Sequence, residues 1–171
     1  MKCERLQECC NCYLNGRKVA GCQRINRCIE SSDARKIVRC TEKNRTYRYE
    51  NSLGNVVIHY HVDGGIVDDA QSIKCDRLLV VGGETYIGVL VELKGNDVKH
   101  GIKQINETLN HYPEFFGSCR RVHARIVATK AVPDLQTTSN YLKLKVRLKS
   151  MYNGSLEVKT LQYKEKDTEL V

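Results

Sequence analysis

The chain has 171 residues, of which 41% are hydrophobic and 28% are charged, so it holds enough apolar material for one domain with a single core. Its net charge is +8, and no uncharged apolar run approaches the roughly 18 residues that cross a bilayer, which excludes a membrane-spanning protein. The first residues lack the apolar segment of a secretory signal, so we expect a cytoplasmic protein whose nine cysteines are reduced.

Residues 1–46 are predicted to form a cysteine-rich N-terminal cap, and residues 47–171 the main domain. Gly16 and Gly21 interrupt any long helix near the start, so we expect short helical or irregular structure there. A structural zinc site in the cap could use Cys9, Cys12, Cys22 and Cys28. Their spacing differs from that of a zinc ribbon, so buried or exposed thiols are the preferred interpretation.

Several strands are predicted between residues 47 and 94. Residues 47–49 and 56–63 are rich in β-branched and aromatic side chains, and so are residues 75–81 and 86–94. Glycines follow these runs, as is typical of strands that end in turns.

The clearest helix follows residue 97. Apolar residues recur at steps of four and three, at Val98, Ile102, Ile105, Leu109 and Tyr112. Asn96 or Asp97 would cap this helix and Pro113 would end it.

Two further strands are predicted, at residues 122–129 and 156–161. The segment between them, residues 138–151, is ambiguous, because strict alternation indicates a strand whereas Tyr141, Leu144 and Leu148 also align on one face of a helix. The order of elements predicts a mixed α/β or α+β domain built on one sheet.

Two acidic residues are predicted to meet across the hairpin of residues 75–94. If its loop is centred on Glu84, Asp76 and Glu92 lie opposite each other, with their Cβ atoms roughly 5 Å apart. Two like charges at that distance are destabilising unless a cation lies between them or one is protonated. Alternation also places Lys94 on the same face as Glu92, while Leu93 points into the core.

This arrangement suits Mg²⁺ or Mn²⁺. Magnesium binds oxygen ligands, commonly one or two carboxylates together with substrate phosphates. Asp76, Glu92 and the backbone carbonyl of Leu93 are the candidate ligands, and Lys94 could orient the attacking water or offset charge in the transition state. The implied reaction is phosphodiester hydrolysis. A solvated ion pair at an exposed strand end is the alternative.

Asp76, followed sixteen residues later by Glu92-Leu93-Lys94, resembles the motif of the PD-(D/E)XK nuclease superfamily, which has the restriction-endonuclease-like fold. The longer stretch is similar to small uncharacterised bacterial proteins assigned to that superfamily, over about residues 56–130. It reads Cys75-Asp76, then Val91-Glu92-Leu93-Lys94-Gly95-Asn96-Asp97-Val98-Lys99-His100, then Gln104. Cys75 replaces the proline that names the motif.

The resemblance implies a central mixed sheet of four strands flanked by helices. In the family, the residues matching Asp76 and Glu92 bind Mg²⁺ and the one matching Lys94 assists the attacking water. Some branches use a glutamine on the following helix, which makes Gln104 a supporting candidate. Many members add an acidic residue from an N-terminal helix, for which Glu30 is the candidate here. The fold also expects a helix after the strand at residues 122–129, which favours a helix at residues 138–151.

Other residues that suggest a site have simpler interpretations. His59 and His61 share a strand face and resemble a metal pair, but their apolar neighbours favour a place on the strand surface. Asp63 lies at a glycine turn and is a weaker candidate for an extra ligand. His100 lies one turn before Gln104 and is a weak candidate for a substrate contact.

The distribution of charge suits a nucleic-acid partner, and chance clustering of solvated charges is the alternative. Residues 51–119 carry 5 basic and 9 acidic side chains, whereas the segments before and after them carry 12 against 6 and 11 against 5. An acidic segment between basic ones suits a polyanion when a cation mediates the contact. The run from Lys143 to Lys149 is predicted to be solvated. Arg120, Arg121 and Arg125 could extend it as a phosphate-binding surface.

The sequence therefore predicts a Mg²⁺-dependent nuclease. Aromatic residues make up only 6% of the chain, which favours duplex DNA over single strands. One alternative is a non-catalytic module that keeps the nuclease fold and binds nucleic acid or a protein partner. Another is a metal-binding interaction domain in residues 1–30. A homodimer is left open.

Overall fold

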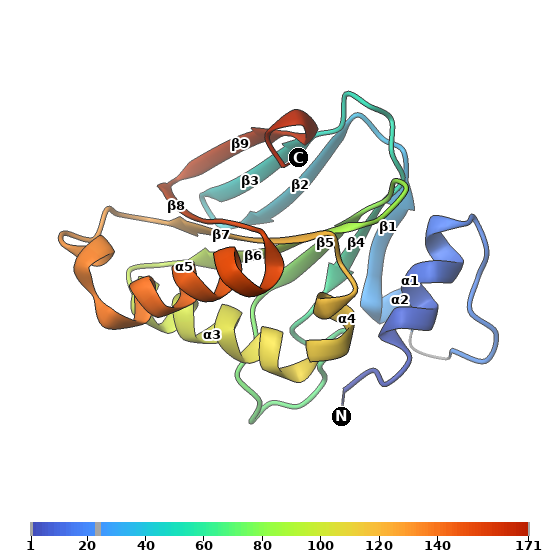
Figure 1. Cartoon of the computed structure of the whole chain (residues 1–171), viewed down its shortest axis with the longest axis horizontal. Helices are drawn as coiled ribbons and strands as arrows, with labels where there is room; N and C mark the ends of the chain where they lie inside the picture. Colours follow the sequence, from blue (N-terminus) through green and yellow to red (C-terminus); the bar gives the residue numbers. More distant parts are fainter. Residues whose placement is uncertain (1, 23–24, 171) are drawn as a thin grey trace.

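The computed structural model describes residues 2–22 and 25–170. Over these residues a six-stranded sheet lies between a layer of helices and a second sheet of three strands (Figure 1). The strands are β1 (Ile29–Asp33), β2 (Ile37–Glu42), β3 (Arg45–Glu50), β4 (Val57–His61), β5 (Arg77–Val81), β6 (Ile87–Lys94), β7 (Arg121–Ala128), β8 (Leu156–Thr160) and β9 (Gln162–Lys166). The helices are α1 (Leu6–Leu14), α2 (Ile25–Cys28), α3 (Val98–His111), α4 (Pro113–Gly117) and α5 (Ser139–Tyr152), with short 3₁₀ turns at Leu135–Thr137 and Asp167–Glu169.

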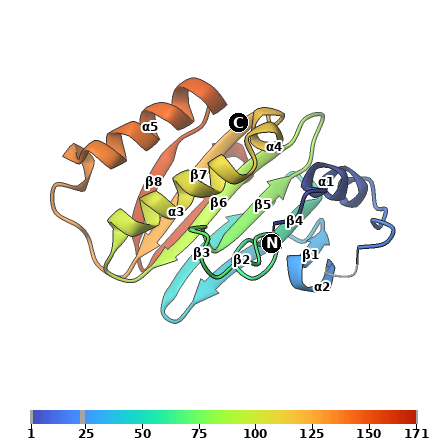
Figure 2. The ribbon, with the colours of Figure 1, turned by 90° about the horizontal axis from the view of Figure 1, so that it is seen from below.

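The main sheet has the strand order β1-β4-β5-β6-β7-β8. Neighbours from β1 to β6 are antiparallel, whereas β6, β7 and β8 run parallel to one another. Parallel neighbours need a crossover, and the helices α3 and α5 provide the two crossovers on the same face of the sheet (Figure 2). Because this sheet is covered on both faces, β5 and β6 are continuous apolar runs through most of their length. The mixed α/β fold that the sequence predicts is confirmed.

The α3 helix forms as its apolar spacing predicts. Its side chains at Val98, Ile102, Ile105 and Leu109 are buried against the sheet. At its start the side chain of Asp97 accepts a hydrogen bond from the backbone N–H of His100, at 2.9 Å, which confirms the predicted cap. Pro113 begins the separate helix α4.

Residues 139–152 form the helix α5. Tyr141, Leu144 and Leu148 are buried on one face, whereas Leu142 and Val146, which the alternating pattern places on the same strand face, are exposed. The helical interpretation is therefore confirmed. The physical reason is that this segment crosses over from β7 to the parallel strand β8, and such crossovers are usually helical.

The prediction of a single sheet is wrong. β2 and β3 form an antiparallel hairpin, and β9 pairs in parallel with β3 to complete a second sheet. Its inner face, with Tyr47 and Tyr49, packs on the main sheet around Val89 and Val91. The boundary predicted at residue 46 therefore falls inside β3, and the helical part of the N-terminal cap ends at Cys28.

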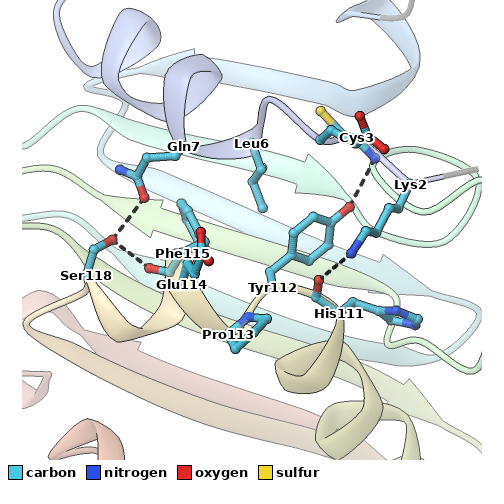
Figure 3. A pocket seen from close by; sticks show the side chains of 11 residues that line it. Lys2, Cys3, Leu6, Gln7, His111, Tyr112, Pro113, Glu114, Phe115 and Ser118 are labelled. Atoms are coloured by element: carbon cyan, nitrogen blue, oxygen red, sulfur yellow. Dashed lines mark hydrogen bonds between the residues drawn. The ribbon is translucent and has the colours of Figure 1, made fainter.

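The helices of the cap, α1 and α2, pack beside the helical layer on the same side of the main sheet (Figures 1 and 2). Figure 3 shows how polar contacts hold it to the end of α3 and to α4: Ser118 Oγ donates to Gln7 Oε1 at 2.9 Å, and Lys2 Nζ donates to the carbonyl of His111 at 3.2 Å. Across the described ranges, every helix is too short or too polar to cross a membrane.

Candidate functional site

The strand register places Asp76 opposite Glu92. Arg77 pairs with Val91 and Leu78 with Leu90 across β5 and β6, so the next position back, Asp76, faces Glu92. Two hydrogen bonds hold the carboxylates side by side. The backbone N–H of Leu93 donates to Asp76 Oδ2 at 2.8 Å, and the backbone N–H of Asp76 donates to Glu92 Oε2 at 3.1 Å. The cross-strand contact expected from a loop centred on Glu84 is therefore present.

Burial makes this pair electrostatically unfavourable. Glu92 is only 1% exposed, and burial together with the charge of Asp76 raises the pKa of Glu92 to about 8. Burial also raises the pKa of Asp76. Two carboxyl groups with raised pKa values lie close together, so the site favours a bound cation or a proton. Carboxylate oxygens are ligands that suit Mg²⁺, and the donor set therefore fits the ion.

Lys94 is held next to this pair by α3. Its Nζ lies 3.6 Å from Glu92 Oε1 and donates a hydrogen bond of 2.5 Å to Gln104 Oε1. The amide nitrogen of Gln104 donates in turn to the carbonyl of Lys74 at 2.7 Å. The structure thus brings Gln104 to the site and fixes it between Lys94 and the chain that leads into β5.

The α3 helix approaches the sheet closely because it has no side chain at Gly101. A Cβ atom placed there would lie 3.2 Å from Glu92 Cγ and 3.6 Å from Lys94 Cβ. Two turns further on, Thr108 Oγ1 accepts a hydrogen bond of 2.9 Å from the backbone N–H of Cys75. The helix therefore contacts the residue directly before Asp76 as well as Glu92 and Lys94 on the neighbouring strand.

Glu30 does not join the site. It lies on β1, and its Oε2 is 3.2 Å from His61 Nε2 and 3.7 Å from His59 Nδ1. His59 is buried and its Nε2 lies 3.4 Å from Cys40 Sγ, so the prediction that it lies on the strand surface is wrong. The charge of another acidic residue, Glu42, contributes to the raised pKa of Asp76.

Glu42 and Arg45 are neighbours at the tip of the β2–β3 hairpin, and the sequence reasoning missed both. Arg45 is buried, lies 3.3 Å from Glu42 through Nη2, and donates through Nη1 to Thr129 Oγ1 at 3.3 Å. Its Nε has no hydrogen-bond partner among residues 2–22 and 25–170. The same guanidinium lies 3.4 Å from the position of a Cβ atom at Gly95, directly after Lys94. The second sheet therefore contributes charged groups to the edge where β6 ends.

The remaining candidates lie outside this group or stay untested. Asp63 pairs with Lys74 at 3.2 Å, and the backbone N–H of His100 is used in the cap of α3. Arg125 is buried in an ion pair with Glu165, so it cannot contribute to a phosphate-binding surface. The side chain of Leu93 lies in the core between the sheets, and the role of its carbonyl as a ligand stays a prediction.

No family model, curated protein or solved structure matches this chain. Within residues 2–22 and 25–170, no three Cys, His, Asp or Glu side chains are placed so that they could hold a metal ion by themselves. The pair of Asp76 and Glu92 has only two such side chains, so an ion there would need further ligands from the backbone, water or substrate. The hollow shown in Figure 3 is lined by other residues and lies between the cap and α4.

Proposed function

We propose that this protein is a Mg²⁺-dependent nuclease that hydrolyses phosphodiester bonds in DNA. The observation that carries the proposal is the pair of Asp76 and Glu92, held side by side by two hydrogen bonds with an ammonium group 3.6 Å from one of them. A pair of like charges in a buried position costs folding free energy, and a divalent cation offsets that cost.

The strand arrangement around the pair supports the proposal. β4, β5 and β6 form an antiparallel meander, α3 crosses the sheet, and β7 returns parallel to β6. A four-stranded mixed sheet of this kind, flanked by helices, is the core that the resemblance to the PD-(D/E)XK superfamily implies. Asp76 and Lys94 lie at the same end of these two strands, because the antiparallel strand β5 begins where β6 ends.

Each residue of the site has a distinct part in the proposed reaction. Asp76, Glu92 and the Leu93 carbonyl would hold the ion, which when bound neutralises charge on the carboxylates and on the phosphate. Lys94 orients the attacking water and stabilises negative charge on the phosphate in the transition state. Gln104 keeps the Lys94 ammonium in place through its 2.5 Å hydrogen bond.

Positive charge at the same edge suits a nucleic-acid backbone. Arg77 is half-buried at the start of β5 and donates through Nη1 to the carbonyl of Asp76 at 3.1 Å, whereas Arg45 is buried in an ion pair with Glu42. Basic groups around a cation site attract phosphates on either side of the one that reacts.

A cleavage assay tests the proposal. Supercoiled and linear DNA are incubated with the full chain in Mg²⁺, in Mn²⁺ and in chelator, together with the variants Asp76→Asn and Lys94→Ala. We expect cleavage that needs the divalent ion and that falls about 10²- to 10³-fold in each variant. Asp33→Asn is the matched control, because Asp33 is a β1 carboxylate paired at the surface with Arg35.

Three results would contradict the nuclease proposal. DNA binding that weakens with salt but is never followed by cleavage would identify a non-catalytic binding module. Cleavage that persists in both site variants would place the activity elsewhere or in a contaminant. A loss of cleavage in Asp33→Asn as large as in Asp76→Asn would show that the effect is not specific to the site.

A further inference from the structure

The outer face of the second sheet is open to solvent. The helices α1 to α5 lie on the far side of the main sheet, and β2, β3 and β9 form the outermost layer opposite them (Figure 1). Alternate side chains of these strands are buried against the main sheet, among them Tyr47, Tyr49 and Glu165. The side chains between them therefore point outward. This outward set is Ile37, Arg39, Thr41, Thr46, Arg48, Glu50, Gln162, Lys164 and Lys166.

Three positively charged residues of this face lie directly opposite one another. Arg39 of β2 pairs with Arg48 of β3, and Arg48 pairs in turn with Lys164 of β9. Because neighbouring strands are about 4.8 Å apart, the three residues form a row of about 10 Å across the sheet. Like charges in opposite positions destabilise a sheet. A negatively charged group placed over this row would therefore stabilise it.

The face itself supplies one carboxylate to offset this charge. Glu50 Oε1 lies 2.9 Å from Arg48 Nη2 and 3.0 Å from Lys164 Nζ. Lys166 pairs with Glu50 in the strand register, so the outward set holds four cations and a single carboxylate. Arg39 is exposed, and over residues 2–22 and 25–170 it takes part in no ion pair. The outer face therefore keeps an excess of positive charge.

The row of cations and the next row of the sheet line one hollow of about 320 Å³. Guanidinium, ammonium, hydroxyl and amide groups donate hydrogen bonds, and phosphate oxygens accept them. The Nε of Arg48 is a buried donor that has no hydrogen-bond partner among the described residues. The residues of the two rows that line the hollow are Arg39, Arg48, Lys164, Thr41, Thr46 and Gln162.

The chemistry of this face suits the backbone of duplex DNA. Phosphates follow one another at a rise of about 3.4 Å along each strand of a duplex, so a row of about 10 Å spans several of them. None of the nine outward residues is aromatic, whereas proteins that bind single strands stack the bases on aromatic side chains. Cations and hydroxyl groups contact phosphates instead, which every sequence presents alike.

We propose that the outer face of β2, β3 and β9 binds the phosphate backbone of duplex DNA through Arg39, Arg48 and Lys164. Contacts of this kind fix a duplex on a protein without reading its sequence. The surface is separate from the nuclease site, because Glu92 packs on α3, on the other side of the main sheet. Binding at this surface does not require that the chain cleaves DNA.

Duplex binding by variants of the full chain tests the proposal. The anisotropy of a fluorescein-labelled duplex of 20 base pairs is measured in chelator, which prevents cleavage that needs a divalent ion. We expect Arg39→Gln and Lys164→Gln each to bind about fivefold more weakly at 0.15 M salt. The slope of log affinity against log salt should become shallower by about 1 in each variant. Lys149→Gln is the matched control, because Lys149 is an exposed cation on α5. It should bind as the original chain does.

Four results of this assay would overturn the proposal. The first is a chain that binds no duplex even at 0.05 M salt, and the second is an equal loss of affinity in Lys149→Gln. The third is tighter binding of a single strand of the same length. The fourth is binding to vesicles of phosphatidylcholine and phosphatidylserine by a chain that does not bind DNA, which would identify a membrane surface as the partner.

A second measurement needs no substitution and so cannot fail through misfolding. The original chain is acetylated on its lysines with and without the duplex, and the modified residues are identified by mass spectrometry. We expect the duplex to protect Lys164 and Lys166 and to leave the acetylation of Lys149 unchanged. Protection of Lys149 without protection of Lys164 would place the DNA on the helical side of the protein, and the proposal would then be wrong.

Discussion

Arg125 and Glu165 neutralise each other's charge between the two sheets. Asp76 and Glu92, which lie where β5 begins and β6 ends, do not neutralise each other. The first two, called here the closed pair, have opposite charges and are joined by hydrogen bonds of 2.6 to 3.0 Å. Tyr47 and Tyr163 donate to the same carboxylate, and the carbonyls of Ala124 and Ser155 accept from the guanidinium. Asp76 and Glu92, the open pair, have the same charge and one nearby ammonium.

The difference separates a structural role from a functional one. A buried pair with matched charges and complete hydrogen bonding holds its surroundings in one arrangement. A buried pair with unmatched charge raises the free energy of the fold, and the raised pKa values of Asp76 and Glu92 are the sign of that cost. Such strain is expected where a protein must bind a cation or stabilise a reaction.

The largest expected change in the free energy of unfolding comes from removing one charge of the closed pair. Glu165→Gln leaves the Arg125 guanidinium buried without a counter-charge, and we expect the free energy of unfolding to fall by about 3 to 5 kcal/mol. The equivalent change in the open pair, Asp76→Asn, should leave stability within about 1 kcal/mol of the original, because it relieves repulsion. Urea denaturation followed by circular dichroism measures both. Equal losses in the two variants would remove the distinction.

The closed pair's surroundings should be sensitive to acid. Burial lowers the pKa of His123, which lies near Arg125, to about 4, so the folded protein binds this proton more weakly than the unfolded chain does. Stability should fall as the pH drops from the ordinary histidine value of 6.5 through about 4, by up to about 3 kcal/mol. Unfolding free energies across this range should show a shallower decline in His123→Gln. Burial also lowers the pKa of His59 to about 4, so the part of the decline that His59 causes should remain in this variant. If stability falls with pH equally steeply in His123→Gln and in the original chain, the assignment to His123 is wrong.

The open pair should respond in the opposite direction. Because the pKa of Glu92 is raised to about 8 from an ordinary 4.5, the folded protein is the more protonated state between these values, and stability falls as the pH rises through them. Without divalent ions, Glu92→Gln should therefore be more stable than the original chain near pH 8, by roughly 2 kcal/mol after allowance for screening by water.

Magnesium should make the original chain the more stable of the two proteins. A ligand that binds only the folded state raises its stability, so saturating Mg²⁺ should raise the melting temperature of the original chain and leave Glu92→Gln almost unchanged. If Glu92→Gln is less stable than the original chain in chelator near pH 8, the account of Glu92 as a strained carboxylate is wrong.

The smallest expected effect on stability is at Gly101. Gly101→Ala gains helix propensity of up to about 1 kcal/mol, but its Cβ would lie 3.2 Å from Glu92 Cγ, so α3 or Glu92 must shift by a few tenths of an ångström. We expect nearly unchanged unfolding and a roughly tenfold loss of cleavage, since the shift displaces the open pair. Gly117→Ala is the matched control, because a Cβ atom there meets nothing within 4 Å. Equal cleavage by the two variants would show that α3 does not set the geometry of the site.

The open pair was predictable because it depends on local pairing. β5 and β6 are consecutive strands joined by a short loop, so their alternation and the position of Glu84 determine that Asp76 faces Glu92. Gln104 was suggested by the resemblance, and the apolar stripe of α3 is consistent with a place for it beside the sheet.

The second sheet and its contribution to the site were not predicted. β2 does alternate, with Val38 and Cys40 buried between exposed neighbours, and this pattern is the signal that could have revealed the hairpin carrying Glu42 and Arg45. Nothing local indicates that β9 returns to pair with β3, or that Glu30 faces two histidines. These contacts depend on how distant segments pack, which single-sequence periodicity does not report.

The pairing of β9 with β3 has a consequence for the order in which the protein matures during synthesis. Tyr47 and Glu165, which are joined across this pairing, are 118 residues apart in sequence. On the ribosome, every strand of the main sheet is made before Glu165 exists to neutralise Arg125. The second sheet, whose hairpin places Arg45 next to Gly95, is therefore completed last. A nascent chain would therefore lack the complete surroundings of the pair of Asp76 and Glu92 until translation has passed β9.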